Sequence, residues 1–355
     1  MCYHPNVLVY KKNSVLKKDG TPGIQRIEIK FANDPNFKGY EYYLEKDKKS
    51  IETDQYGEKI RYKLIPCGKC IQCRKQERYT WSTRIELEAK QYENNHFLTL
   101  TYNEENIKIP DYTVNKKTGE IIYNDGTWQG TLVKKDLQQF IKSLRNWCER
   151  EYGHQGIKFY ACGEYGEIGE RPHYHIILMN TPKLDKYHIP NTKDLLSNKN
   201  IENIWHKGFI TIGDCNWTTI GYTAGYCQKK LFGEFKEEYY AKKGQEPIFA
   251  NMSRRPGIGR SWFEEHKYDI YDLDEIINSK GKSVRPPVYF DRLMDIGEHD
   301  VMEAIKEKRN ELAYNRTKAK MSKTNLTLAE QYKIDERTAI ENFKKYRKKG
   351  KFINV

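Results

Sequence analysis

The sequence contains no long apolar run. None of its segments reaches the roughly 18 consecutive apolar residues that a membrane-spanning helix needs. The N-terminus, Met1 to Pro5, also lacks the apolar core of a secretory signal peptide. We therefore expect a soluble, cytoplasmic protein with no membrane partner.

Cysteine is scarce, and acidic residues are too few to balance the basic ones. The chain has eight cysteines, and without an export signal we expect reduced thiols or metal ligands rather than disulfides. The 49 Asp and Glu residues face 62 Lys and Arg, which gives a formal net charge of +13 at pH 7. This excess favours a polyanionic partner. Because 27 tyrosines can stack on unpaired bases, we expect that partner to be nucleic acid.

The order of hydrophobic patterns predicts an α+β fold. Strands and helices that follow one another in this order favour an antiparallel sheet flanked by helices. The expected strands are residues 96–102, 157–162, 171–179 and 207–212, and the expected helices are residues 73–90, 136–150 and 220–231. Beyond about residue 300 the chain is charged and helical in pattern, which predicts a basic helical C-terminal region.

These patterns divide the chain into four expected parts. Residues 1–92 form an N-terminal segment that carries cysteines and a basic helix, and residues 93–235 form the core with the sheet. Residues 236–300 contain a basic loop and accessory elements, and residues 301–355 form a charged helical tail. In the helix of residues 73–90 we expect Trp81, Ile85 and Leu87 to face a core.

Two histidines flank Tyr174 at the start of an apolar strand. Successive side chains of a strand alternate between its two faces, so we expect His173 and His175 to point the same way. Two neutral imidazoles on one rigid strand supply two ligands of a metal site. The alternative is a pair of chance histidines at a strand end.

A carboxylate near this pair is expected as the third ligand. Glu164 closes the preceding strand, which is the partner in an expected hairpin, so its side chain can approach both imidazoles. Two imidazoles and one carboxylate with open positions suit Mg²⁺ or Mn²⁺ bound to a phosphate oxygen. The ligand types also allow zinc.

Tyr222 and Tyr226 are candidate nucleophiles. They lie four residues apart, and hence on one face of the expected helix. A phenol has a pKa near 10, so a nucleophilic tyrosine needs help at neutral pH. Lys229 and Lys230, one turn further on, are candidates to lower that pKa or to hold a phosphate. The alternative is a tyrosine pair packed at the edge of a core.

Cys67-x-x-Cys70-x-x-Cys73 gathers three thiols. The segment lacks the fourth cysteine of an iron–sulfur sequence, because Glu77 occupies that place. Either Cys2 or His4 could complete a tetrahedral set of ligands, which predicts a structural Zn²⁺. The alternative is a set of reduced thiols partly buried in the core.

Arginines at two places are candidates for contacts with nucleic acid. Residues 254–260 form a basic loop with Gly and Pro, whose amides and guanidinium groups can hold phosphates, although a plain surface turn is the alternative. No Walker-type Gly-Lys-Ser/Thr pattern occurs in the chain, so we infer no nucleotide hydrolysis. The candidates are Arg74, Arg78 and Arg84, expected on the outer face of the first helix, and Arg254, Arg255 and Arg260 in the loop.

Taken in order, these motifs resemble the HUH endonuclease superfamily. The resemblance is carried by the strand of residues 97–102, by His173-Tyr174-His175 and by Tyr222-x-x-x-Tyr226. With the cysteine motif and residues 253–259, the chain resembles more narrowly the rolling-circle replication initiators of the Microviridae, especially gokushoviruses. The resemblance extends from about Cys2 to about Arg292. It departs at Gly225, where related two-tyrosine initiators often have a lysine.

The resemblance implies an endonuclease that cuts and joins DNA strands. One tyrosine would attack the phosphodiester, giving a 5′-phosphotyrosyl link and a free 3′-hydroxyl, and the second would serve the joining step. The implied partners are the origin in single-stranded and supercoiled circular DNA, a host helicase and a host DNA polymerase, in the cytoplasm of a host bacterium. The alternatives are a transposase or relaxase of the same superfamily, and a non-catalytic zinc-containing nucleic-acid-binding protein.

Overall fold

The chain forms two compact units in the computed structural model. The terminal unit comprises the described residues of 2–76 and 292–348, and the central unit those of 77–291. The structure describes residues 2–16, 22–29, 40, 52–53, 59–116, 118–226 and 234–348.

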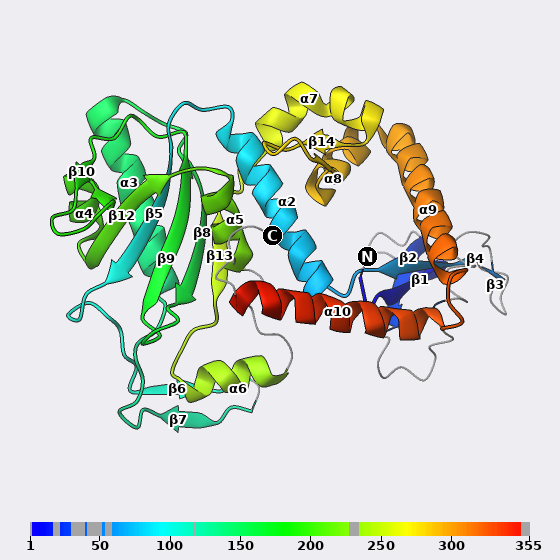
Figure 1. The fold of residues 1–355 in the computed structure, drawn as a ribbon, viewed down its shortest axis with the longest axis horizontal. Coiled ribbons are helices and arrows are strands. Elements are labelled where there is room, and N and C mark those ends of the chain that lie inside the picture. The colour runs from blue at the N-terminus through cyan, green and yellow to red at the C-terminus, as the bar shows by residue number, and fades with distance from the viewer. Residues whose placement is uncertain are drawn as a thin grey trace. The chain divides into compact units, whose positions relative to one another are not determined.

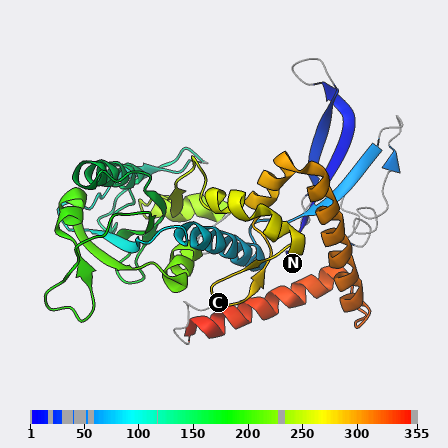
Figure 2. The ribbon, with the colours of Figure 1, turned by 90° about the horizontal axis from the view of Figure 1, so that it is seen from above.

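The terminal unit contains an antiparallel sheet with the strand order β2-β1-β4-β3. Strand β1 (Asn6–Leu16) pairs with β2 (Pro22–Ile29) and with β4 (Lys59–Ile65), and β4 pairs with β3 (Glu52–Thr53). Figure 2 shows β1 and β2, in blue, as a long hairpin. The strand expected from the alternating residues near 25–30 is part of this hairpin.

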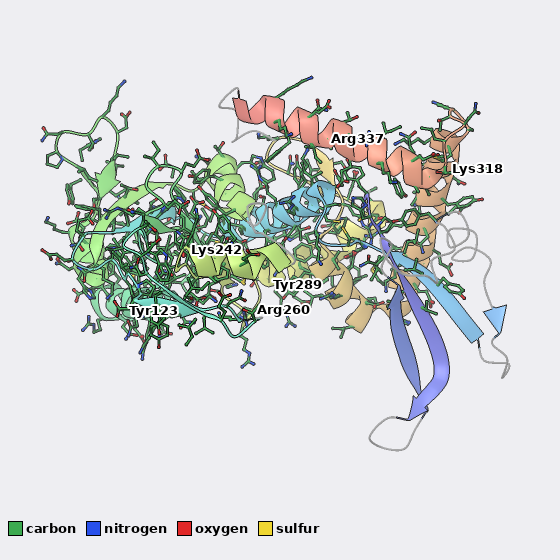
Figure 3. The ribbon with its side chains drawn as sticks, turned by 90° about the horizontal axis from the view of Figure 1, so that it is seen from below. Tyr123, Lys242, Arg260, Tyr289, Lys318 and Arg337 are labelled. Carbon is green, nitrogen blue, oxygen red and sulfur yellow. The ribbon has the colours of Figure 1, made fainter. Side chains whose placement is uncertain are left out.

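Two long helices follow in the terminal unit, α9 (His299–Met321) and α10 (Leu328–Lys348). Lys318 lies on the first and Arg337 on the second (Figure 3). Leu328 and Tyr332 of α10 pack against Tyr40 in a small core. The predicted helical C-terminal region is therefore confirmed for the described residues.

The central unit is built on a seven-stranded antiparallel sheet, as the sequence predicts (Figure 1). Its order is β10-β11-β12-β5-β9-β8-β13, so the histidine strand β9 lies between β5 and β8. The strands are β5 (Asn95–Tyr102), β8 (Lys158–Tyr165), β9 (Pro172–Met179), β10 (Tyr187–His188), β11 (Leu196–Ser197), β12 (Gly208–Asp214) and β13 (Phe249–Met252). None of the helices in the described parts of the chain is both long and apolar enough to cross a bilayer.

Helices cover both faces of this sheet. On one face, Tyr174, Ile176 and Leu178 belong to a core that also includes residues of α3 (Lys134–Tyr152) and α4 (Lys199–Trp205). On the other face, Ile177 and Met179 pack with residues of α2 (Ile71–Ala89) and α5 (Trp217–Gly225). Strand alternation puts His173 and His175 on this second face. The remaining elements are β6 (Tyr112–Val114), β7 (Ile121–Tyr123), α6 (Glu234–Lys242), α7 (Arg260–Leu273), β14 (Ile276–Ile277), β15 (Ser283–Val284) and α8 (Val288–Gly297).

Helix α5 begins three residues earlier than its apolar pattern indicates. The Asn216 side chain accepts hydrogen bonds from the backbone N–H groups of Thr218 and Thr219, and the Thr219 hydroxyl accepts one from the Asn216 N–H. This reciprocal cap satisfies amides that the first turn leaves free. Tyr226 follows the last helical residue, and the rest of the expected helix, residues 227–231, lies outside the described residues.

The expectation that Arg84 faces outward is wrong. Its side chain is only 8% exposed, and its Nε atom donates a hydrogen bond to the carbonyl of Ile258 at 3.0 Å. The guanidinium carbon lies 4.3 Å from the ring centroid of Trp81 and 4.0 Å from that of Tyr289. The reason is that α2 is covered on all sides in its C-terminal half, where every residue from Ser82 to Ala89 is buried.

Candidate active site

His173, His175 and Glu164 form a compact group of metal-ligating side chains. Glu164 on β8 lies directly opposite His173 on β9 in the register of the sheet. The Glu164 Oε1 atom is 2.9 Å from the His173 Nε2 atom and 3.3 Å from the His175 Nε2 atom, and the two Nε2 atoms are 3.1 Å apart. Glu164 and His175 are buried. The structure thus brings the three predicted ligands together.

The outer nitrogens of both imidazoles are held by neighbouring groups. The Nδ1 atom of His173 lies 3.0 Å from the carbonyl oxygen of Arg171, and the Nδ1 atom of His175 lies 3.1 Å from the Thr99 hydroxyl. A carbonyl can only accept, so Nδ1 of His173 carries the proton and Nε2 keeps its lone pair. Such outer contacts orient metal-binding histidines and select their tautomer.

The spacing of the three donor atoms fits a divalent cation. Neighbouring ligands at about 2.1 Å from an octahedral Mg²⁺-type ion lie about 3.0 Å apart. The three donor–donor distances, 2.9, 3.1 and 3.3 Å, agree with this spacing. Two imidazoles and one carboxylate with open positions suit an ion that also binds a substrate oxygen. The donor set allows zinc as well.

Tyr222 and Tyr226 lie against this group. The ring centroids of Tyr222 and His175 are 5.0 Å apart, and the Tyr226 ring stacks on His175 at 5.1 Å with an interplanar angle of 9°. The two phenol rings are themselves 4.9 Å apart. The structure therefore brings both predicted nucleophiles next to the predicted ligands.

The surroundings of the two phenols favour their neutral forms. Burial raises the pKa of both Tyr222 and Tyr226 above the ordinary value of 10, and the negative charge of Glu164 raises both further. Tyr226 also donates a hydrogen bond to Glu164, which holds its proton. A nucleophilic role for either phenol therefore requires positive charge beside it.

Arg78 of α2 supplies a cation beside the tyrosine helix. Its Nη2 atom lies 3.2 Å from the place where a Cβ would stand at Gly221, and its Nε atom 3.4 Å from that place at Gly225. Burial lowers the pKa of Arg78, and no carboxylate within the described segments forms an ion pair with it. The glycines make room for the guanidinium, which is partly desolvated and has charge available for an anion.

The predicted arginines of the basic loop lie elsewhere on the central unit. Arg254, Arg255 and Arg260 are exposed, and Arg260 lies 3.4 Å from Glu264 (Figure 3 labels Arg260). A cavity of about 770 Å³ borders this loop and includes Arg254, Arg255, Arg145 and Lys158 in its lining.

Two arginines of α2 and the lysine pair complete the predicted set. Arg74 lies in the first turn of α2, and Arg84 is buried between aromatic rings. Contacts of both with nucleic acid stay predictions. Lys229 and Lys230 lie outside the described residues.

The four cysteines Cys2, Cys67, Cys70 and Cys73 come together in the terminal unit, with all ligand atoms within 4.8 Å of one another. His4, the other candidate for the fourth ligand, instead places its Nε2 atom 2.6 Å from a carboxylate oxygen of Glu336. Of the two alternatives left open by the sequence, the structure therefore favours Cys2.

Two side chains of the site were missed by the sequence analysis. Thr99 contacts Nδ1 of His175, and the Phe97 ring stacks on the His175 ring at 5.5 Å. Both lie on β5, whose register places Thr99 directly opposite His175. Alternation along residues 96–102 indicates which of them share a face, but only the pairing of β5 with β9 identifies the histidine that they contact.

Comparison with known proteins identifies relatives with one theme. Residues 95–231 match the family described as replication-associated protein ORF2 or gene 2 protein. The chain is 35% identical to the replication-associated protein ORF2 of Spiroplasma virus 4 over 258 residues, which cover 70% of this chain and 74% of the relative. It is 26% identical to the replication-associated protein VP4 of Bdellovibrio phage phiMH2K, covering 64% of this chain and 66% of that protein.

A third relative is more distant. The replication-associated protein ORF4 of Chlamydia phage 1 is 23% identical over 64% of this chain and 52% of its own length. No solved structure matches the chain. The matched family region contains β5, β8, β9 and α5, and therefore all three candidate metal ligands and both tyrosines.

Proposed function

The chain belongs to the replication-associated proteins of Microviridae-type phages, and we propose that it is a HUH-type endonuclease that nicks and rejoins phage DNA in rolling-circle replication. The proposal is carried by the contact of the His175 imidazole with the rings of both Tyr222 and Tyr226. A phenol beside this Glu-His-His group would have a nucleophile and a cation within reach of one phosphodiester.

Each ligand has a defined part in the proposal. Glu164, His173 and His175 would hold a divalent ion, which when bound polarises a phosphate oxygen and offsets the charge of the transition state. Thr99 and the Arg171 carbonyl keep the imidazoles oriented with Nε2 toward the ion.

Cleavage would be a transesterification on one tyrosine. The phenol oxygen attacks phosphorus and gives up its proton, a phosphorus–oxygen bond to tyrosine forms, and the bond to the 3′-oxygen breaks. The 3′-oxygen takes up a proton, so the products are a 5′-phosphotyrosyl link and a 3′-hydroxyl. The new link keeps the phosphodiester bond energy, so that rejoining needs no nucleotide. The 3′-hydroxyl would serve a host polymerase, and a host helicase would unwind the duplex.

The second tyrosine would allow a second cut after one round of copying. The phenol rings of Tyr222 and Tyr226 are 4.9 Å apart, so a phosphate near one is also near the other. While the first phenol remains linked to DNA, the other can attack the regenerated origin. The 3′-hydroxyl released by that second cut then attacks the first link and closes the circle.

Arg78 would take the part that a lysine between the tyrosines has in related initiators. This chain has Gly225 there, and the Arg78 guanidinium lies over that glycine. A guanidinium presents several N–H donors to phosphate oxygens. Arg78 would therefore hold the scissile phosphate or the attacking oxygen in the transition state.

The exposed arginines would hold DNA away from the cut. The cavity that borders Arg254 and Arg255 includes Lys158, at the start of β8, whereas Glu164 is near the end of that strand. Six residues of strand separate the two positions by roughly 20 Å. Together with Arg260, this loop would contact the phosphates of flanking nucleotides.

A circular DNA that carries the phage origin tests the proposal. The expected result is metal-dependent nicking of the supercoiled form, with the protein linked through tyrosine to the 5′ end. An oligonucleotide that spans the origin should give the same adduct and a free 3′-hydroxyl. Retardation of the DNA without any cleavage would instead identify a binding protein and refute the enzyme.

A further inference from the structure

Four thiols from two distant parts of the chain meet in the terminal unit. Cys2 lies before strand β1, and Cys67, Cys70 and Cys73 lie between β4 and the first turn of α2. Their sulfur atoms are all within 4.8 Å of one another. No step of the proposed cleavage uses them, so this group requires its own explanation.

The sheet register accounts for the meeting. Strands β1 and β4 pair antiparallel, with Asn6 opposite Ile65. The chain that enters β1 and the chain that leaves β4 therefore lie at the same end of the sheet. Cys2 stands a few residues before this pair and Cys67 stands just after it, so the pairing of the two strands brings them together.

The sulfur spacing is that of a tetrahedral metal site. Four ligands at about 2.3 Å from a zinc ion are about 3.8 Å apart. The Sγ atoms of Cys2 and Cys70 are 3.8 Å apart, and those of Cys67 and Cys73 are 4.0 Å apart. A disulfide would instead require a sulfur–sulfur distance of about 2.05 Å. The spacing thus fits a shared ion rather than two cross-links.

Backbone amides point at the sulfur atoms. The N–H of Cys67 donates to the sulfur of Cys2, and the N–H groups of Lys69 and Cys70 donate to that of Cys67. Gly68 makes this turn with φ at +72°, a conformation that other residues rarely adopt. Amide donors, and the nearby N-terminus of α2, stabilise the thiolate form that a metal binds.

We propose that Cys2, Cys67, Cys70 and Cys73 bind one structural Zn²⁺ ion that joins the start of β1 to the end of β4 and to α2. All four positions are protein ligands, so the site has no open place for a substrate. The core described around Tyr40, Leu328 and Tyr332 is small, and a small core commonly needs such a cross-link. The site is independent of the proposed function, because none of its ligands belongs to the Glu-His-His group.

The first experiment measures metal content in the full-length protein. The variant H173A/H175A removes two ligands of the other site, so that any tightly bound zinc reports on the cysteines. We expect about one zinc per chain in this variant, and loss of that zinc when C67S/C70S is added. Cys215, which lies outside the group, provides the matched control, and C215S should retain the metal.

A second measurement leaves the cysteines intact, in case C67S/C70S does not fold. X-ray absorption on the zinc of H173A/H175A should show four sulfur neighbours at about 2.3 Å. Replacement by Co²⁺ should give the intense visible and charge-transfer bands of tetrahedral thiolate ligation. Nitrogen or oxygen neighbours, iron instead of zinc, thiols already oxidised to disulfides, or protein that binds no metal would overturn the proposal.

Discussion

The imidazole of His175 stacks on the phenol of Tyr226, with ring centroids 5.1 Å apart and an interplanar angle of 9°. The same imidazole has its Nε2 atom 3.3 Å from Glu164, and Tyr226 donates a hydrogen bond to that carboxylate. One strand residue is thus shared between the metal-ligand group and the tyrosine pair. The predictions on cleavage follow from this shared position.

Removing both phenol hydroxyls should abolish the covalent DNA adduct. Y222F/Y226F keeps the rings that pack on His175 but has no oxygen to attack phosphorus. Each single variant should still form an adduct once but fail to complete strand joining. Adducts are measured with a labelled origin oligonucleotide on denaturing gels. Tyr123 is exposed on β7, and Y123F should match the wild type; adducts in the double variant would contradict the assignment.

Removing the two imidazoles should separate cleavage from DNA binding. H173A/H175A leaves Glu164 as the last member of the ligand group, so metal-dependent nicking should fall below detection. Binding of the origin, measured by fluorescence anisotropy, should remain within a few-fold because the arginines are unchanged. H188A, at an exposed histidine of β10, is the control. Undiminished nicking in H173A/H175A would leave the metal group without a catalytic part.

Loss of the Thr99 hydroxyl should weaken metal binding without removing a ligand. In T99V the Nδ1 atom of His175 loses its contact at 3.1 Å, so the ring is held less firmly. Outer partners of this kind contribute about 10–100-fold to metal affinity. A metal titration of nicking should therefore shift to higher concentration, with the maximal rate largely recovered at saturation. T211V, on the neighbouring strand β12, should leave the titration unchanged.

Arg78 should affect the rate of cleavage more than DNA affinity. We expect R78A to lower the single-turnover nicking rate by about 10²-fold, because one donor to the transition-state charge is lost. R78K should recover part of the rate, since charge returns without the planar donor set. R150A, at an exposed arginine of α3, tests whether any lost positive charge has this effect. Equal losses in R78A and R150A would argue against a specific role.

Buried His96 should make the protein less stable in mild acid. Burial lowers the pKa of His96 from 6.5 to about 4, and neither ring nitrogen has a hydrogen-bond partner within the described residues. The unfolded chain therefore binds a proton between these two pH values that the folded chain does not. The free energy of unfolding falls as pH drops from 6.5 toward 4, by up to about 3 kcal/mol from this group.

Urea unfolding of H96L and of the wild type checks this prediction. The difference in unfolding free energy between the two proteins should move in favour of H96L as the pH is lowered from about 7 to about 4.5, because leucine does not titrate. Other ionisable groups are common to both proteins and cancel in the comparison. A difference that does not change with pH would show that His96 is not the group responsible.

The site could be predicted as far as local periodicity extends. Alternation in a strand puts His173 and His175 on one face, and helical spacing puts Tyr222 and Tyr226 on another, whatever the surroundings. The hairpin between β8 and β9 is local in the chain, so Glu164 could also be placed near the histidines. Thr99 could not, because its partner depends on the pairing of β5 with β9 across more than 70 residues.

Burial on a helix was harder to predict than contact within a hairpin. Arg84 was expected outside because arginine is usually exposed, yet the ring faces of Trp81 and Tyr289 and the carbonyl of Ile258 accommodate its charge inside. Those partners come from distant parts of the chain. The choice between Cys2 and His4 was open for the same kind of reason, since it depends on the pairing of His4 with Glu336.

The sequence by itself determined the residue types and the local repeats: an antiparallel α+β core, paired imidazoles, paired phenols and a three-cysteine motif. These follow from the backbone periods of strands and helices, which act over a few residues. Only the tertiary structure decided which face of the sheet α5 covers, and therefore that the phenols meet the imidazoles. It also decided that Arg78 lies over Gly221 and Gly225 and that Cys2 joins the other thiols. Such meetings depend on packing and strand pairing between distant segments, which no local pattern specifies.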